Sequence, residues 1–151
     1  MANNILQLQA GRPSDAAGGR PDYKMTHTFD LAGVATSDVL YAFKLPAGHR
    51  CKNVTLKVVT PTGLTSTAAV GIYSDIVGSA VSNNSFDASA NLNAAAGTLT
   101  TGAGGTDAYV TAGGYLNLTP ADTYICLTLS VTGGPIVAGS VEVVALCADE
   151  T

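Results

Sequence analysis

The 151-residue sequence contains no tryptophan, and only 12% of its residues are charged. Helical periodicity is also missing, because no segment repeats apolar residues at positions i, i+3, i+4 and i+7 over several turns. The alanine-rich run at 88–96 is interrupted by Asn91 and Asn93 and is followed by Gly97. We therefore expect little or no helix.

Long apolar runs are absent as well. No run approaches the ~18 residues needed to cross a bilayer, which argues against an integral membrane protein. Residues 1–15, MANNILQLQAGRPSD, lack a basic segment, and Ile5-Leu6 is their one apolar pair. We expect a chain that is made and kept in a cytosol, with no membrane partner.

Cysteine is scarce and has no CxxC spacing: the three residues are Cys51, Cys126 and Cys147. Cys126 and Cys147 fall within apolar segments. We favour buried free thiols over a disulfide or a metal site, since an odd number without paired spacing fits neither well.

No catalytic signature is present. His27 and His49 are the two histidines. A His-x-Cys pair such as His49 and Cys51, expected in a partly exposed turn, can supply two zinc ligands, but two ligands do not make a site. The GAGG stretch at 102–105 lacks the Lys-Ser/Thr of a phosphate-binding loop, and there is no GxSxG elbow. We predict no enzyme, no cofactor and no metal.

Basic residues are confined to the first part of the chain. Residues 1–57 hold seven basic and four acidic side chains, a net charge of 7 − 4 = +3, whereas residues 58–151 hold seven acids and no base. The two parts can attract each other, steer docking between copies or onto an acidic shell, or simply be solvated. Because acids interrupt the basic residues, nucleic-acid binding is not expected.

Period-two alternation of apolar residues dominates what is present. Val39, Tyr41, Phe43 and Leu45 alternate before Pro46-Ala47-Gly48, and alternation resumes in 54–58, so we predict a β-hairpin over 38–60 with these four residues on one face. Further strands are expected at 26–31, 66–74, 106–111, 114–118, 123–131 and 139–148, with irregular strands near 81–86 and 97–101. Thr132-Gly133-Gly134-Pro135 is read as a turn that sends the chain back antiparallel.

This pattern predicts an all-β fold, an antiparallel two-sheet β-sandwich of jelly-roll type with an extended N-terminal arm. The closing strand 139–148 is apolar on nearly both faces, so it should be central or covered by a neighbouring subunit. The predicted core residues are Val39, Tyr41, Phe43, Val54, Leu56, Val58, Val70, Ile72, Ile125, Leu127, Leu129, Val141 and Val143.

The N-terminal segment differs from the rest. Residues 1–25 are rich in Asn, Gln, Gly, Ala, Asp and Pro and contain Gly-Arg-Pro twice. We predict two parts, an arm at 1–25 that orders only against a partner and a sandwich at 26–151; the alternative is that the arm is a simple tail.

Several segments together resemble a known group of proteins. DVLYAFKLPAG, a basic turn leading into NVTLKVVT, TAAVGIYSD, GYLNLTPADTYICLTLSV and GSVEVVALCADE resemble the decoration, or cement, proteins of tailed-phage heads. The resemblance covers about residues 36–148 and rests on the turn at Leu45–Gly48, the strand around Gly71-Ile72-Tyr73 and the strand after Ala121-Asp122.

This resemblance implies a non-enzymatic virion protein that stabilises a capsid by bridging neighbouring major capsid proteins. It would act as a homotrimer on the capsid exterior, after assembly in the host cytoplasm. The alternative is a carbohydrate-binding or adhesive β-sandwich, which the lack of tryptophan disfavours. Predicted contacts to the capsid or another subunit are Arg12, Arg20, Lys24, His49, Arg50 and Lys52.

Overall fold

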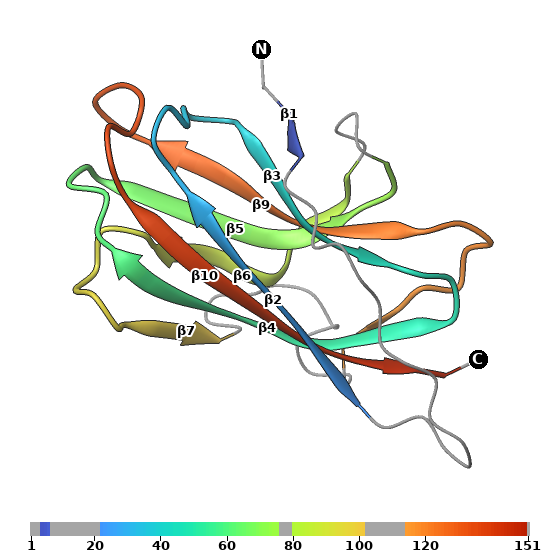
Figure 1. The fold of residues 1–151 in the computed structure, drawn as a ribbon. Coiled ribbons are helices and arrows are strands. Elements are labelled where there is room, and N and C mark those ends of the chain that lie inside the picture. The colour runs from blue at the N-terminus through green and yellow to red at the C-terminus, as the bar shows by residue number, and fades with distance from the viewer. Residues whose placement is uncertain (1–3, 7–21, 76–79, 102–113, 151) are drawn as a thin grey trace.

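The computed structural model describes residues 4–6, 22–75, 80–101 and 114–150. These residues form strands and loops without a helix, so none of them forms a helix that could span a membrane. The strands, shown in Figure 1, are β1 (Asn4–Leu6), β2 (Tyr23–Asp30), β3 (Val39–Leu45), β4 (His49–Thr60), β5 (Ser66–Tyr73), β6 (Ala80–Asn91), β7 (Leu99–Thr101), β8 (Tyr115–Leu116), β9 (Thr123–Val131) and β10 (Ser140–Asp149).

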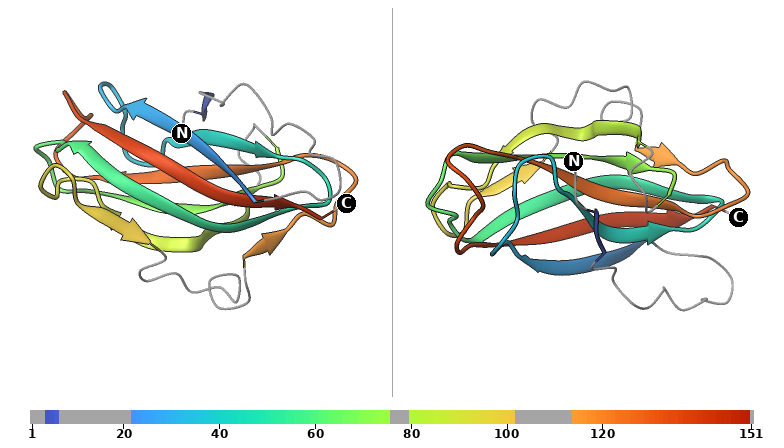
Figure 2. Two further views of the ribbon diagram at one scale, coloured as in Figure 1. Left: turned by 60° about the horizontal axis from the view of Figure 1, so that its bottom comes forward. Right: turned by 90° about the horizontal axis from the view of Figure 1, so that it is seen from above.

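Two sheets pack face to face, as Figure 2 shows. The first has the order β1-β3-β9-β5-β6 and is called sheet A here. The second, sheet B, has the order β2-β10-β4-β7, and β8 also pairs with β4. All pairings are antiparallel except that of β1 with β3. The predicted all-β two-sheet sandwich is confirmed; jelly roll remains our interpretation of this strand order.

Strand β10 lies in the interior of sheet B, between β2 and β4. Val141, Val143 and Ala145 are buried in the core, while Val144 and Leu146 on the opposite face are half-buried. The prediction that the closing strand is central in its sheet is therefore confirmed. Packing between the two sheets accounts for the apolar residues on its inner face.

The predicted hairpin over 38–60 is wrong. Strand β3 pairs with β9 in sheet A, whereas β4 pairs with β10 in sheet B. The turn at Pro46–Gly48, closed by the backbone N–H of His49 donating to the carbonyl of Pro46 at 3.1 Å, carries the chain from one sheet to the other. Each strand can bury an apolar face against the opposite sheet in this arrangement. The alternation of apolar residues is therefore compatible with a crossing between sheets as well as with a hairpin.

The turn after β9 also connects the two sheets. Strands β9 and β10 lie in different sheets, so the segment at 132–139 crosses the end of the sandwich and does not close a hairpin. Among the strands of the described residues, β5 and β6 alone are both consecutive in the chain and paired with each other.

The prediction that Val39, Tyr41, Phe43 and Leu45 lie on one face of β3 is also wrong. The register of β3 against β9 shifts between Tyr41 and Phe43. One extra residue in a strand reverses the alternation, so side chains before and after it point to opposite faces. Val39 and Tyr41 accordingly pack with Tyr73 and Cys126 in a separate cluster, whereas Phe43 and Leu45 join the main core.

All thirteen predicted core residues are nevertheless buried. Most belong to one cluster between the sheets. Phe29, Leu31, Val34 and Ile136 also belong to this cluster, although the sequence pattern had not predicted them as core residues. The prediction was correct for burial and wrong for sidedness at two positions of β3.

The low-complexity region contains the two irregular strands expected there. Strand β6 is longer than predicted and shows three register shifts against β5, and β7 covers the end of the predicted 97–101 segment. The strand expected at 106–111 lies outside the described residues. At the other end of the chain, β2 begins at Tyr23, and β1 pairs with β3, so both described pieces of the predicted arm are strands.

Candidate interface

The predicted contact residues of the sandwich gather at one end of the molecule. The starts of β2 and β4 meet the end of β10 there, because Asp149 lies opposite His49 and Cys147 lies opposite Tyr23. Lys24 is exposed on β2, and Arg50 and Lys52 are half-buried on β4. Arg12 and Arg20 lie outside the described residues. We call this region the charged end.

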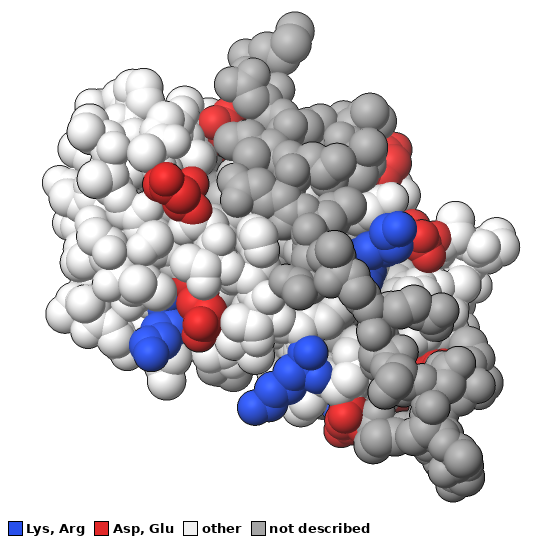
Figure 3. All heavy atoms as spheres, viewed as in Figure 1, with Lys and Arg blue, Asp and Glu red and all other residues white. Residues whose placement is uncertain are grey.

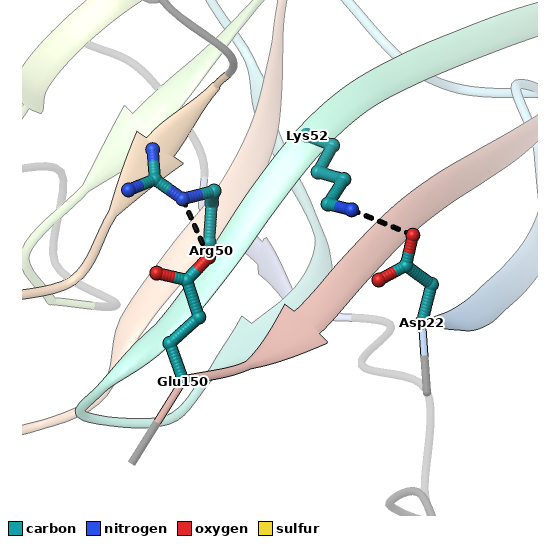
Figure 4. A network of polar contacts seen from close by, with 4 residues as sticks. All are labelled: Asp22, Arg50, Lys52 and Glu150. Carbon is teal, nitrogen blue, oxygen red and sulfur yellow. Dashed lines mark hydrogen bonds and ion pairs between the residues drawn. The ribbon is translucent and has the colours of Figure 1, made fainter. Parts of the chain in front are cut away.

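Two ion pairs hold the strands of the charged end together (Figure 4). The Nε–H of Arg50 donates to Oε2 of Glu150 at 2.7 Å, and Nζ of Lys52 donates to Oδ2 of Asp22 at 2.6 Å. The first pair joins β4 to the residue after β10, and the second joins β4 to the residue before β2. Both partly exposed basic groups therefore have a carboxylate within their own chain.

His49 is buried, which corrects the partly exposed turn predicted for it. Its Nδ1 is hydrogen-bonded to the hydroxyl of Tyr23 at 2.6 Å, and its Nε2 lies 3.6 Å from Oδ1 of Asp149. The Tyr23 ring also meets the imidazole edge to face, with centroids 5.7 Å apart. With these partners His49 links β2, β4 and β10 from the inside, and little of its side chain is exposed.

Asn117 fixes the turn that precedes β4. Its backbone N–H donates to the carbonyl of His49 at 2.9 Å, and its carbonyl accepts from the N–H of Gly48 at 2.8 Å. Its buried side-chain amide donates to the carbonyl of Leu45 at 3.0 Å. The polar atoms of this turn are thus held by the segment after β8, which gives the charged end a defined backbone.

The thiols are buried, including Cys51, whose position beside the turn had suggested some exposure. Burial raises the pKa of Cys51, and the neighbouring Cys147, opposite it on β10, raises it further. Burial also raises the pKa of Cys126. Among the described residues, no group of three His, Cys, Asp or Glu side chains is arranged to hold a metal ion.

Some of the basic residues in the first part of the chain form ion pairs with acidic residues in the later part. Arg50 with Glu150 and Lys44 with Asp122 at 3.7 Å each join the basic first part to the acidic remainder. The imidazole of His49 lies beside Asp149 in the same way. His49 and Arg50, but not Lys44, had been singled out from the sequence, and the acidic residues beside all three had been missed. The excess of acid after residue 57 was the available signal, although it did not identify which acids would pair.

The fold of this chain is similar to folds found in solved structures. No protein-family model matches the sequence, and no match is found among curated protein sequences. Solved structures do match. The fold is similar to a chain in the capsid of Ralstonia phage GP4, with a TM-score of 0.66 and 17% identity over 97% of this chain and 99% of that chain. It is also similar to a chain in the capsid asymmetric unit of cyanophage Pam1, with a TM-score of 0.56 and 18% identity over 94% of each chain.

Proposed function

We propose that this chain is a structural protein of a tailed-phage virion that decorates the outside of the capsid, bridging neighbouring major capsid proteins as a homotrimer. The observation that carries the proposal is the end-to-end likeness to chains of two phage capsids, which covers nearly the whole of each compared chain. The sequence resemblance to cement proteins supports the decorating role over a shell-forming one.

The proposed mechanism is the preferential binding of the closed shell. A protein that binds only the assembled state stabilises it by mass action, by about 2.7 kcal/mol per site at a free concentration one hundred times its Kd. Many copies acting at seams between capsomers therefore oppose the internal pressure of packaged DNA. Such a role needs a rigid sandwich with specific surfaces and no catalytic group.

The proposed attachment surface is the N-terminal arm together with the exposed basic residues. Lys24 is exposed on β2, and Arg12 and Arg20 belong to the part of the arm beyond the described residues. Arg50 and Lys52 have carboxylate partners within the chain, so they offer less free charge to a capsid than the sequence suggested. We therefore propose Arg12, Arg20 and Lys24 as the main cationic contacts to an acidic shell.

Adding the purified chain back to particles that lack it tests the proposal. We expect saturable binding, a fixed number of copies per particle and a higher temperature of DNA release. A mutant particle that remains undecorated and equally stable in the presence of the chain would overturn the decorating role. Binding to glycans without binding to particles would instead favour an adhesive module.

A further inference from the structure

The end of the sandwich opposite the charged end is built from four loops. They comprise residues 31–37, 61–65, 92–98 and 132–139, and Figures 1 and 2 show them together at the left of the molecule. Backbone hydrogen bonds join them: the N–H of Gly33 donates to the carbonyl of Ile136 at 2.7 Å, that of Thr132 to Thr65 at 2.9 Å, and that of Thr62 to Leu92 at 3.3 Å. Because the loops are joined, they form one continuous surface, called the neutral end here.

None of these loops contains a charged residue. Their sequences are LAGVATS, PTGLT, LNAAAGT and TGGPIVAG. In Figure 3 the outermost left edge of the molecule is white, with blue and red atoms lying just inside it. The nearby Asp38 is buried, and its Oδ2 accepts a hydrogen bond from the backbone N–H of Ala35 at 2.9 Å. The four loops therefore present small, hydroxyl, amide and apolar groups. They are bordered by the exposed Asp30, whose Oδ1 accepts a hydrogen bond from the backbone N–H of Ala32 at 3.0 Å.

The loops are held firmly in place by the core. Ile136 and Val34 are buried in the main cluster, and the backbone N–H of Ile136 donates to the carbonyl of Val34 at 2.8 Å. Gly139 packs so closely on Thr62 that an added Cβ would lie 3.0 Å from its Cγ2. A surface that is already ordered loses little conformational entropy when it binds a partner.

Val137 projects from the neutral end with 84% of its surface exposed. Val59 and Leu99 are exposed elsewhere at this end, Val59 at the end of β4 before the 61–65 loop and Leu99 in β7 after the 92–98 loop. Leu118 is equally exposed, at 83%, but it lies at the opposite end, where Arg50, Lys52 and Glu150 are found. The neutral end therefore joins exposed apolar side chains with a lack of charge.

We infer that the neutral end is where copies of this chain meet around a rotational axis. In a closed ring the same residues of each copy approach one another near the axis, so a charged surface would face its own charge. A neutral apolar surface avoids that repulsion, and the cores of homo-oligomeric interfaces are correspondingly depleted of charge. A partner of different sequence is instead commonly recognised through complementary charges, which the opposite end of the molecule carries.

This inference rests on the proposed homotrimer and names the surface that forms it. It predicts that Val137→Glu makes the full chain monomeric, while Leu118→Glu leaves its molar mass unchanged. Light scattering after gel filtration, at protein concentrations from about 1 to 100 µM, measures both variants. Circular dichroism on the same samples shows that each has kept its β fold. A wild-type chain that is monomeric throughout, or a Val137→Glu variant that assembles as the wild type does, would overturn the inference.

Mixing two charge variants tests whether the surface meets itself. Val137→Lys alone should also be monomeric, whereas an equimolar mixture of Val137→Lys and Val137→Glu should recover mixed oligomers at low salt. Recovery is expected only where Val137 of one copy approaches Val137 of another. If both single variants dissociate and the mixture does not recover, these positions do not face each other and the rotational arrangement is wrong.

Binding to particles separates this inference from the proposed function. A monomeric Val137→Glu variant that still binds particles, at least tenfold more weakly because it loses multivalency, supports both proposals. Wild-type oligomers that fail to bind any particle would overturn the decorating role and leave the interface intact.

Discussion

Arg50 and Glu150 are 100 positions apart in the sequence, yet the Nε–H of Arg50 donates to Oε2 of Glu150 at 2.7 Å. The contact joins the start of β4 to the end of the described chain. Both side chains are partly exposed, so solvent screens the pair and its contribution to global stability is expected to be below about 1 kcal/mol.

Arg50→Ala should therefore release the end of β10 without unfolding the protein. Amide hydrogen exchange at Ala148 and Asp149 should increase, while the Tm changes little. Lys44→Ala, which removes the more exposed pair with Asp122, should leave exchange in β10 unchanged. Equal exchange in the wild type and in Arg50→Ala would show that the ion pair does not hold this end.

Leu56 is 2% exposed in β4, and its truncation to alanine should cost about 2–5 kcal/mol through lost burial and a residual cavity. Val59→Ala, in the same strand with 44% exposure, should change stability by less than about 0.5 kcal/mol. Chemical denaturation measures both variants. A Leu56→Ala midpoint equal to that of Val59→Ala would place Leu56 outside the core.

Gly114 has a φ of +97°, and a Cβ there would lie 1.9 Å from the carbonyl oxygen of Cys51. Gly33 has a similar φ of +84° with open space around it. Gly33→Ala should cost about 1–2 kcal/mol from the left-handed backbone alone. Gly114→Ala should cost about 4 kcal/mol or more, because the backbone of β4 must also move away. Similar losses in the two variants would contradict the close approach of Gly114 to β4.

His27 packs edge to face on Phe29, and burial lowers its pKa below the usual 6.5. The folded state therefore favours the neutral imidazole, and the unfolded chain binds a proton more readily. The associated stability is present above pH 6.5 and is lost as the pH falls through the lower folded-state pKa. His27→Gln should reduce the loss of stability on acidification, measured by urea unfolding across this range, while above it the difference between the two chains should be independent of pH. A variant with the same acid sensitivity as the wild type would exclude this contribution.

All three thiols should resist modification in the native protein, because Cys51, Cys126 and Cys147 are buried and free. A thiol reagent should label them only after denaturation, including Cys51. Intact mass should be the same with and without a reductant. Rapid labelling of any thiol under native conditions would contradict the packing described here.

The positions of most described strands and the burial of all thirteen predicted core residues followed from the sequence. Alternation over 123–131 predicted β9 with the bounds that the structure shows, and glycine-rich or proline-containing segments marked the turns around it. Such signals are local, because burial of one face imposes a period of two on each strand whatever its partners are. The same local signal made Leu56, Ile125 and Val143 recognisable as core residues.

Sheet membership was decided only by the tertiary structure. The turn at Pro46–Gly48 connects two sheets, although its composition suits a hairpin equally well, because either arrangement covers the apolar face of β3. The shift in register after Tyr41 then reversed part of that strand, which no alternation pattern alone could show. The order of the strands in sheet B also places Asp149 beside His49 and Glu150 beside Arg50. These residues are 100 positions apart in the sequence, so no local pattern predicts their contacts.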